Sequence, residues 1–242
     1  MKVRRLFVVL LWSTSAGAGD LELTVALEPA RSVDVYARMT GQVERIAVLE
    51  GDRVAAGDTL ALLEEGALRL AEAAAGVACR KAQGRLERAE QMWARGLISV
   101  QQVESIRYEA EAARIRREEA RFALARAVVL APMGGLVARC EVRIGELTSP
   151  GMLLFRIIDP EDLAAELFVP ADRLDLVRPG QAVTARSTLS PVSLLSGRVL
   201  RISPVIDPES GTCRAVAAFP GAGKWVRPGT PVRVMLTNRA GK

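Results

Sequence analysis

The sequence predicts a mainly β, elongated protein of several small domains that carries a long α-helical hairpin. Apolar residues recur at alternating steps of three and four across residues 64–127, which is the spacing of a coiled coil. The flanking segments, residues 37–63 and 128–157, are copies of each other at a constant offset of 94 residues. Short alternating segments after residue 158 indicate a further group of β-strands.

The first 18 residues have the composition of a secretory signal peptide. Three basic residues within the first five positions precede an apolar run, residues 6–12, and the small residues at 16–18 fit a cleavage site. The alternative is an uncleaved membrane anchor, but that run is much shorter than the roughly 20 residues that a spanning helix needs. We therefore expect export and cleavage after Ala18.

The two copies read as equivalent sets of short strands. Apolar and polar residues alternate between the glycines, as in residues 42–48, which is the period of a strand. We interpret the glycines as tight turns and assign them no chemistry. The glycines keep the same register in both copies: Gly41, Gly51 and Gly57, then Gly135, Gly145 and Gly151.

The helical segment is interrupted once, at residues 95–98. Gly96 suits the left-handed conformation that ends a helix. Ser99 is a natural N-cap, and Gln102 completes a capping box. Two antiparallel helices of about 30 residues, each roughly 45 Å long, are therefore expected.

The seam of this hairpin, meaning the positions that face the other helix, follows from the apolar spacing. Arg85 and Arg117 occupy the one seam position in each helix that is not apolar. The apolar seam positions are Leu68, Ala71, Ala75, Ala78, Ala82, Ala89 and Met92 before the interruption, and Val103, Ile106, Ala110, Ala113, Ala120, Leu124 and Ala127 after it.

The last third of the chain, residues 158–242, reads as short strands separated by Pro-Gly turns, with a short helix at 171–177. An alternating segment near the start, residues 21–32, is expected to join them. Short strands at this spacing are typical of a small β-barrel.

These features carry a resemblance to a known family. The two half-motifs, Ala37–Leu60 and Ala131–Leu154, are similar to the halves of a biotinyl/lipoyl domain, and here the hairpin replaces the junction between them. Val169-Pro-Ala-Asp172 followed by Gly180-Gln181 is similar to the β-barrel domain of periplasmic adaptor subunits. The chain thus resembles, from about residue 33 to 236, the HlyD-like membrane fusion proteins of RND-type tripartite efflux pumps.

The resemblance implies a domain organisation. It consists of a signal peptide (1–18), a β-barrel domain (19–36 and 158–242), a split biotinyl/lipoyl-like domain (37–63 and 128–157) and the α-helical hairpin (64–127). The membrane-proximal domain of many such adaptors is expected to be missing or vestigial, since little sequence remains for it.

The resemblance also implies a function. Such adaptors link an inner-membrane RND-type transporter to an outer-membrane channel for efflux of small molecules. They work in the periplasm, held at the inner membrane by their partner. They are not enzymes and bind no cofactor, and they assemble as homo-oligomeric rings, typically hexamers.

In this family the hairpin tip is thought to dock on the channel. The tip signature matches Arg88, Met92 and Ser99, with Met92 replacing the usual leucine, and Trp93 lies beside them. Each residue has a plainer interpretation. Arg88 is then a surface charge paired with Glu87 or Glu90, Met92 a seam residue, Ser99 a cap, and Trp93 packs under the turn.

Composition argues against other classes of function. The chain has no histidine, the commonest metal ligand and general base, and its three cysteines do not form a disulfide framework. A net charge of +5 is compatible with nucleic-acid binding, but only 4% of residues are aromatic and the protein is expected to be exported. We expect no metal, cofactor or nucleic-acid site.

Three alternatives remain open. A biotin or lipoate carrier would need a lysine at the junction, and the one available, Lys81, lies mid-helix without the Met-Lys context of biotinylation. An adaptor of another exporter, such as an ABC or type I secretion system, usually has an N-terminal spanning helix. A metal-efflux adaptor is also possible, although the methionines are scattered and better explained by packing.

Overall fold

The computed structural model describes residues 20–188, 194–224 and 226–237, and the expected signal peptide at 1–18 lies outside them. The chain forms two compact units. Unit 1 combines residues 1–32 and 158–242, and unit 2 comprises residues 33–157. No helix among the described residues has the length and apolar character needed to cross a membrane.

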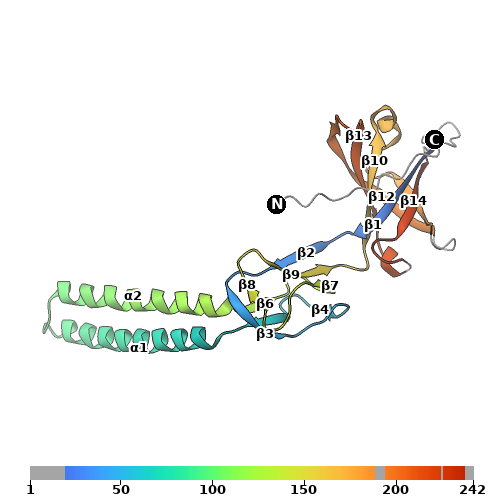
Figure 1. Cartoon of the computed structure of the whole chain (residues 1–242). Coiled ribbons are helices and arrows are strands. Elements are labelled where there is room, and N and C mark those ends of the chain that lie inside the picture. The colour runs from blue at the N-terminus through green and yellow to red at the C-terminus, as the bar shows by residue number, and fades with distance from the viewer. Residues whose placement is uncertain (1–19, 189–193, 225, 238–242) are drawn as a thin grey trace. The chain divides into compact units, whose positions relative to one another are not determined.

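Unit 1 is a closed barrel, in the strand order β1-β10-β13-β12-β11-β14, with β14 pairing back onto β1 (Figure 1). The early strand and the late strands therefore complete one barrel, as the alternating patterns predict. The strands are β1 (Asp20–Pro29), β10 (Leu163–Pro170), β11 (Ala182–Ser187), β12 (Leu194–Asp207), β13 (Thr212–Phe219) and β14 (Pro231–Thr237).

The barrel core follows from strand alternation. Along β10, Leu163, Ala165, Leu167 and Val169 are fully buried, while the residues between them are more exposed. Successive side chains of a strand point to opposite faces, so one face of each strand fills the interior. The expected short helix at 171–177 is a 3₁₀ helix, η1 (Ala171–Leu176), and a second, η2 (Ala222–Lys224), precedes β14.

Unit 2 contains two four-stranded sheets, ordered β2-β9-β7-β4 and β6-β5-β3-β8. Each sheet takes two strands from each sequence copy, so the halves interleave. The strands are β2 (Ser32–Tyr36), β3 (Gly41–Ile46), β4 (Arg53–Val54), β5 (Thr59–Leu63), β6 (Val128–Leu130), β7 (Gly135–Cys140), β8 (Leu147–Thr148) and β9 (Leu153–Ile158).

The duplication seen in the sequence is also present in the hydrogen bonds. The amide of Gly51 donates to the carbonyl of Val137, and the amide of Gly145 donates to the carbonyl of Val43, each at 2.8 Å. Both pairs of residues are related by the 94-residue offset, with the copies exchanged. Gly51 and Gly145 have φ angles of 95° and 85°, in the left-handed region that favours glycine.

Residues 33–36 of strand β2 lie in unit 2, whereas the expected domain organisation places residues 19–36 in the barrel domain. β2 is hydrogen-bonded to β9. Asp34 of β2 also accepts hydrogen bonds from Arg156 of β9, at 2.6 and 2.8 Å. This bidentate pair and the strand pairing attach residues 33–36 to the sheets of unit 2.

The helices α1 (Gly66–Ala94) and α2 (Val100–Ala125) form the expected antiparallel hairpin (Figure 1). Val103 and Ala113 of α2 are buried in the seam, as predicted. In α1 the prediction is wrong at alternate positions, because Ala71, Ala78 and Met92 are exposed. Beside Ala78, Cys79 is buried instead. Alanine at many neighbouring positions leaves little contrast in hydrophobicity, so the apolar spacing alone did not define which face turns inward.

Candidate functional site

The hairpin extends from the place where the two copies of the β scaffold meet. β5 leads into α1, and α2 leads into β6. These two strands pair, with Leu62 opposite Val128, and the amide of Leu63 donates to the carbonyl of Ala127 at 2.8 Å. The start of α1 and the end of α2 therefore lie side by side on the paired strands, and the reversal of the chain lies at the far end of the hairpin (Figure 1).

The reversal is built from two capping motifs. The amide of Leu97 donates to the carbonyl of Met92 at 2.9 Å, and the amide of Gly96 donates to the carbonyl of Trp93 at 2.8 Å. This is the hydrogen-bond pattern of a Schellman motif, and Gly96 has the positive φ, 73°, that the motif requires. Ser99 and Gln102 then form the predicted capping box at the start of α2.

The structure brings Met92, Trp93 and Ser99 together at this tip, with Arg88 one turn further down α1. Met92 is 43% exposed and Trp93 47% exposed, so the interpretations of Met92 as a seam residue and of Trp93 as packed under the turn are not supported. The Ser99 hydroxyl accepts the amide of Gln102 at 3.3 Å, so this side chain serves the cap. Contact of these four residues with a partner stays a prediction.

Sequence reasoning missed two exposed apolar residues at the tip. Leu97, in the turn, is 64% exposed, and Val100, the first residue of α2, is 56% exposed. Turn positions are usually polar, so apolar residues on both sides of a capped turn could have indicated a contact surface. Together with Met92 and Trp93 they give the tip an apolar surface.

Charged residues below the tip connect the two helices. Arg107 pairs with Glu90 at 3.2 Å, Arg85 with Glu109 at 2.6 Å, and Arg117 with Glu72 at 3.7 Å. These pairs are largely exposed, so each contributes only about 0.2–1 kcal/mol. Glu90 is thus engaged across the hairpin and not with Arg88, which is exposed and makes no ion pair within the described part of the chain.

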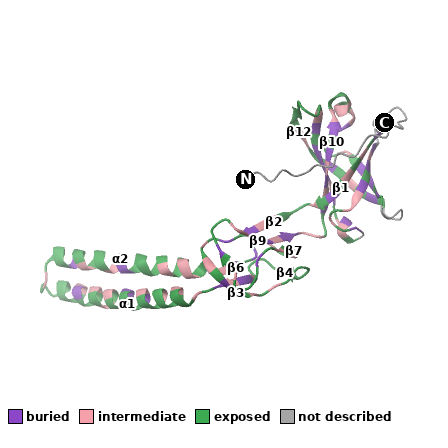
Figure 2. Cartoon of the chain, viewed as in Figure 1, coloured by how far each residue is buried: buried purple, intermediate pink, exposed green. Residues whose placement is uncertain are grey.

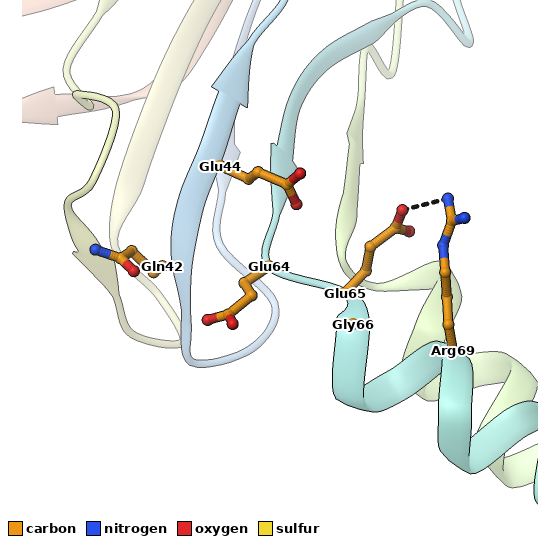
Figure 3. A pocket seen from close by; sticks show the side chains of 6 residues that line it. All are labelled: Gln42, Glu44, Glu64, Glu65, Gly66 and Arg69. Carbon is orange, nitrogen blue, oxygen red and sulfur yellow. Dashed lines mark ion pairs between the residues drawn. The ribbon is translucent and has the colours of Figure 1, made fainter.

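A second candidate lies at the base of the hairpin. An open hollow of about 500 Å³ is lined by residues around the start of α1, including Glu44, Glu64 and Glu65 (Figure 3). Glu65 forms an ion pair with Arg69, and Figure 3 shows the carboxylates of Glu44 and Glu64 pointing in different directions. Nowhere in the described residues do three His, Cys, Asp or Glu side chains gather closely enough to hold a metal ion. The hairpin tip is therefore the stronger candidate.

Both units match known protein families. Residues 32–158 match the family described as "CusB, barrel-sandwich hybrid domain". Residues 165–240 match the family described as "CusB-like, beta-barrel domain". Together these matches cover the duplicated scaffold with its hairpin and most of the barrel.

Curated relatives are similar to the chain over most of its length. The chain is 30% identical to "Nodulation protein NolF" of Rhizobium meliloti over 84% of its own length and 58% of the relative's. It is 28% identical to "Nickel-cobalt-cadmium resistance protein NccB" of Alcaligenes xylosoxydans xylosoxydans, over 94% of its own length and 60% of the relative's. The chain thus spans somewhat over half the length of these relatives.

A solved structure has the same fold. The chimeric MacA-MexA protein, which contains the α-hairpin domain of Pseudomonas aeruginosa MexA, superposes with a TM-score of 0.84 at 18% identity. The match covers 90% of this chain and 81% of the chimera. At this identity the likeness concerns the fold, including a hairpin inserted into a β scaffold.

Proposed function

The chain belongs to the CusB-like family of membrane fusion, or adaptor, proteins, and on that basis we propose that it links an inner-membrane RND-type transporter to an outer-membrane channel during efflux. Its role is to bind and position these partners, and we assign it no catalysis and no cofactor. The exported cargo passes through the assembly, whose selectivity lies with the transporter.

One observation carries the proposal: the far end of the hairpin presents apolar residues to solvent on a rigid turn. Met92, Trp93, Leu97 and Val100 are exposed around the two capping motifs, and the exposed cation of Arg88 lies below them. Aromatic residues and arginine beside a small apolar surface are typical of the centre of a protein–protein interface. A preorganised tip loses little conformational freedom when it binds.

The proposal includes a location and an assembly. The chain works in the periplasm after removal of residues 1–18, held at the inner membrane through the transporter. Several copies, six by family resemblance, form a ring, so that their hairpins reach the channel together. A ring multiplies a small contact at each tip, because the tips bind as one multivalent surface.

The cargo class has two candidates. Small organic molecules are the cargo that the resemblance implies, and metal cations are the second candidate because NccB is named a nickel-cobalt-cadmium resistance protein. Deleting the gene and measuring sensitivity to nickel, cobalt and a panel of organic toxicants distinguishes them. Sensitivity to the metals alone would favour the second candidate.

Affinity capture tests the docking proposal. The tagged full-length chain is cross-linked in cells and captured from solubilised envelopes, and bound outer-membrane proteins are identified by mass spectrometry. We expect Arg88→Asp to remove the channel, because it reverses an exposed positive charge beside the apolar tip. Arg121→Asp is the matched control, an exposed arginine near the base of α2.

Two results would contradict the proposal at different levels. Capture of the channel at wild-type levels by Arg88→Asp would exclude Arg88 from the contact. Absence of any outer-membrane channel from the wild-type capture would overturn docking through the tip.

A further inference from the structure

Three neighbouring strands of the barrel carry exposed arginines and almost no acidic residue. The strands follow one another in the order β12-β11-β14. Their one carboxylate belongs to Asp207, the last residue of β12. We call the surface formed by their four arginines the basic face. These are Arg186 of β11, Arg198 and Arg201 of β12, and Arg233 of β14.

The arginines of the basic face point away from the barrel interior. Successive side chains of a strand point to opposite faces, and each arginine adjoins a residue that packs into the barrel core. Figure 2 shows buried and exposed positions mixed along the barrel strands. The neighbours that pack into the core are Ala185, Val199, Ile202, Val232 and Val234.

Two of these arginines lie directly opposite each other. Arg186 is in register with Arg233 on one side and with Leu194, which is 57% exposed, on the other. Like charges at opposite positions of neighbouring strands destabilise a sheet. Glu22 pairs with Arg233 at 3.0 Å, but the other three arginines make no ion pair among the residues that the structure describes. The basic face therefore has positive charge available to bind an external anion.

The acidic side of the barrel offers little charge to the basic face of another copy. Strands β1 and β10 carry carboxylates and no basic residue. Glu22 already pairs with Arg233, and Glu166 pairs with Arg214 at 3.3 Å, both within one barrel. Two carboxylates of this side are thus engaged inside the chain. We therefore expect the basic face to meet an anionic surface other than a second barrel.

We propose that the basic face binds the anionic phospholipid surface of the inner membrane. Guanidinium groups donate paired hydrogen bonds to phosphate oxygens, and the exposed side chain of Leu194 enters the boundary between headgroups and acyl chains. The inference rests on the proposed function, which places the chain at this membrane.

The spacing of the charges favours a lipid surface over an acidic protein. Leu194, which is opposite Arg186, lies four residues before Arg198 on the same strand, about 13 Å away. The cations are thus spread over the face and do not converge on one point. Lipid headgroups move laterally and can meet such a spread, whereas an acidic protein needs carboxylates fixed at matching positions.

Vesicle sedimentation tests the contact. The full chain is exported with its own leader, purified, and mixed with phosphatidylcholine vesicles that contain about 30% phosphatidylglycerol, or with phosphatidylcholine vesicles alone. We expect binding to the anionic vesicles only. Binding is expected to fall steeply as salt is raised, because salt screens exposed charges.

Paired substitutions test whether the basic face makes the contact. Arg186→Gln combined with Arg198→Gln is expected to weaken binding about 25-fold, since each arginine near an anionic surface contributes roughly fivefold. Arg38→Gln combined with Arg45→Gln is the matched control, because both are exposed arginines of unit 2 and the change in net charge is the same. The control is expected to lose less than about threefold, and circular dichroism checks that both variants fold.

A leucine substitution tests the apolar part of the contact. Leu194→Ser is expected to weaken binding to the anionic vesicles about threefold and to leave its salt dependence unchanged, because no charge is lost. Leu147→Ser, at an exposed leucine of unit 2, is the control and is expected to bind as the wild type does. Equal binding by the two leucine variants would remove Leu194 from the contact.

Other outcomes would overturn the proposal itself. Equal losses in the two paired arginine variants would show that net charge alone drives binding. Equal binding to both kinds of vesicle, or to neither, would exclude recognition of anionic lipid. Binding of the wild type to immobilised polyglutamate without binding to vesicles would identify an acidic protein as the partner instead.

Channel capture separates this inference from the proposed function. The paired variant of Arg186 and Arg198 is expected to capture the outer-membrane channel as the wild type does, because both residues lie in unit 1. Absence of lipid binding with channel capture retained would contradict only this inference. Lipid binding without channel capture would support the basic face and contradict the docking role.

Discussion

The backbone amide of Leu97 donates a 2.9 Å hydrogen bond to the carbonyl of Met92, which holds two exposed apolar residues on either side of one turn. Gly96 between them has a φ of 73°. The conformation of a single glycine therefore determines how the tip residues are presented.

Gly96→Ala is expected to destabilise the hairpin by about 1–2 kcal/mol, because a side chain disfavours the left-handed conformation by that amount. Urea unfolding followed by circular dichroism measures the change. Gly66→Ala is the control, since Gly66 begins α1 with a negative or extended φ and open space around its Cβ position. It is expected to be neutral or to stabilise by up to about 1 kcal/mol. Equal losses in the two variants would contradict the role of Gly96.

Leu97→Asp is expected to abolish capture of the outer-membrane channel without lowering the free energy of unfolding. Leu97 is exposed at the tip, so the folded state loses little apolar burial, while a docked partner would bury the new charge. Leu200 is another exposed leucine, on the barrel strand β12, so Leu200→Asp serves as the control and is expected to leave capture unchanged. Retention of the channel by Leu97→Asp would place the contact elsewhere.

Gly223→Ala is expected to destabilise the barrel by about 3 kcal/mol or more, because the added methyl group would overlap backbone atoms, which cannot move aside as a flexible side chain can. A Cβ atom at Gly223 would lie 1.7 Å from the carbonyl oxygen of Pro160. Gly229→Ala gives a graded comparison: its φ is 90° and its surroundings are open, so only the backbone strain of about 1–2 kcal/mol applies. Thermal denaturation ranks the two variants, and the reverse order would refute the steric argument.

The free energy of unfolding of the barrel is expected to depend on pH through Asp159. The hydrogen bond from Arg31, and then the amide of Glu161, hold the pKa of Asp159 below its usual value. A lowered pKa in the folded state means that this stabilisation is present above the unfolded pKa, near 4, and is lost as pH falls through the folded pKa. The difference in unfolding free energy between the wild type and Asp159→Asn should therefore shrink from pH 7 to pH 3. A difference that is constant with pH would show that the Asp159 charge does not contribute.

Much of the β scaffold could be predicted because its signals are local and repeated. Gly51 and Gly145 hold the same register in both copies, and in the structure they make exchanged hydrogen bonds to Val137 and Val43. The start of α2 was equally readable, since Ser99 and Gln102 need only each other to form a capping box.

The inward face of α1 was harder to predict because it depends on the partner helix. Apolar character alone favours Ala71 over Glu72 for the seam position at this level. In the structure Ala71 is exposed, and Glu72 turns toward α2 and pairs with Arg117. That arrangement depends on a residue more than 40 positions away, which the spacing of apolar residues in α1 cannot report.

Both helices are attached to the paired strands β5 and β6, and the turn at the other end is self-contained. The length of the hairpin can therefore change without a change at either end. Seven residues inserted at matched levels of each helix would carry the turn outward by about 10 Å while preserving every inward and outward position. Proteins that evolve from this scaffold could therefore span cell envelopes of different depth by changes in helix length alone, with the base and the turn preserved.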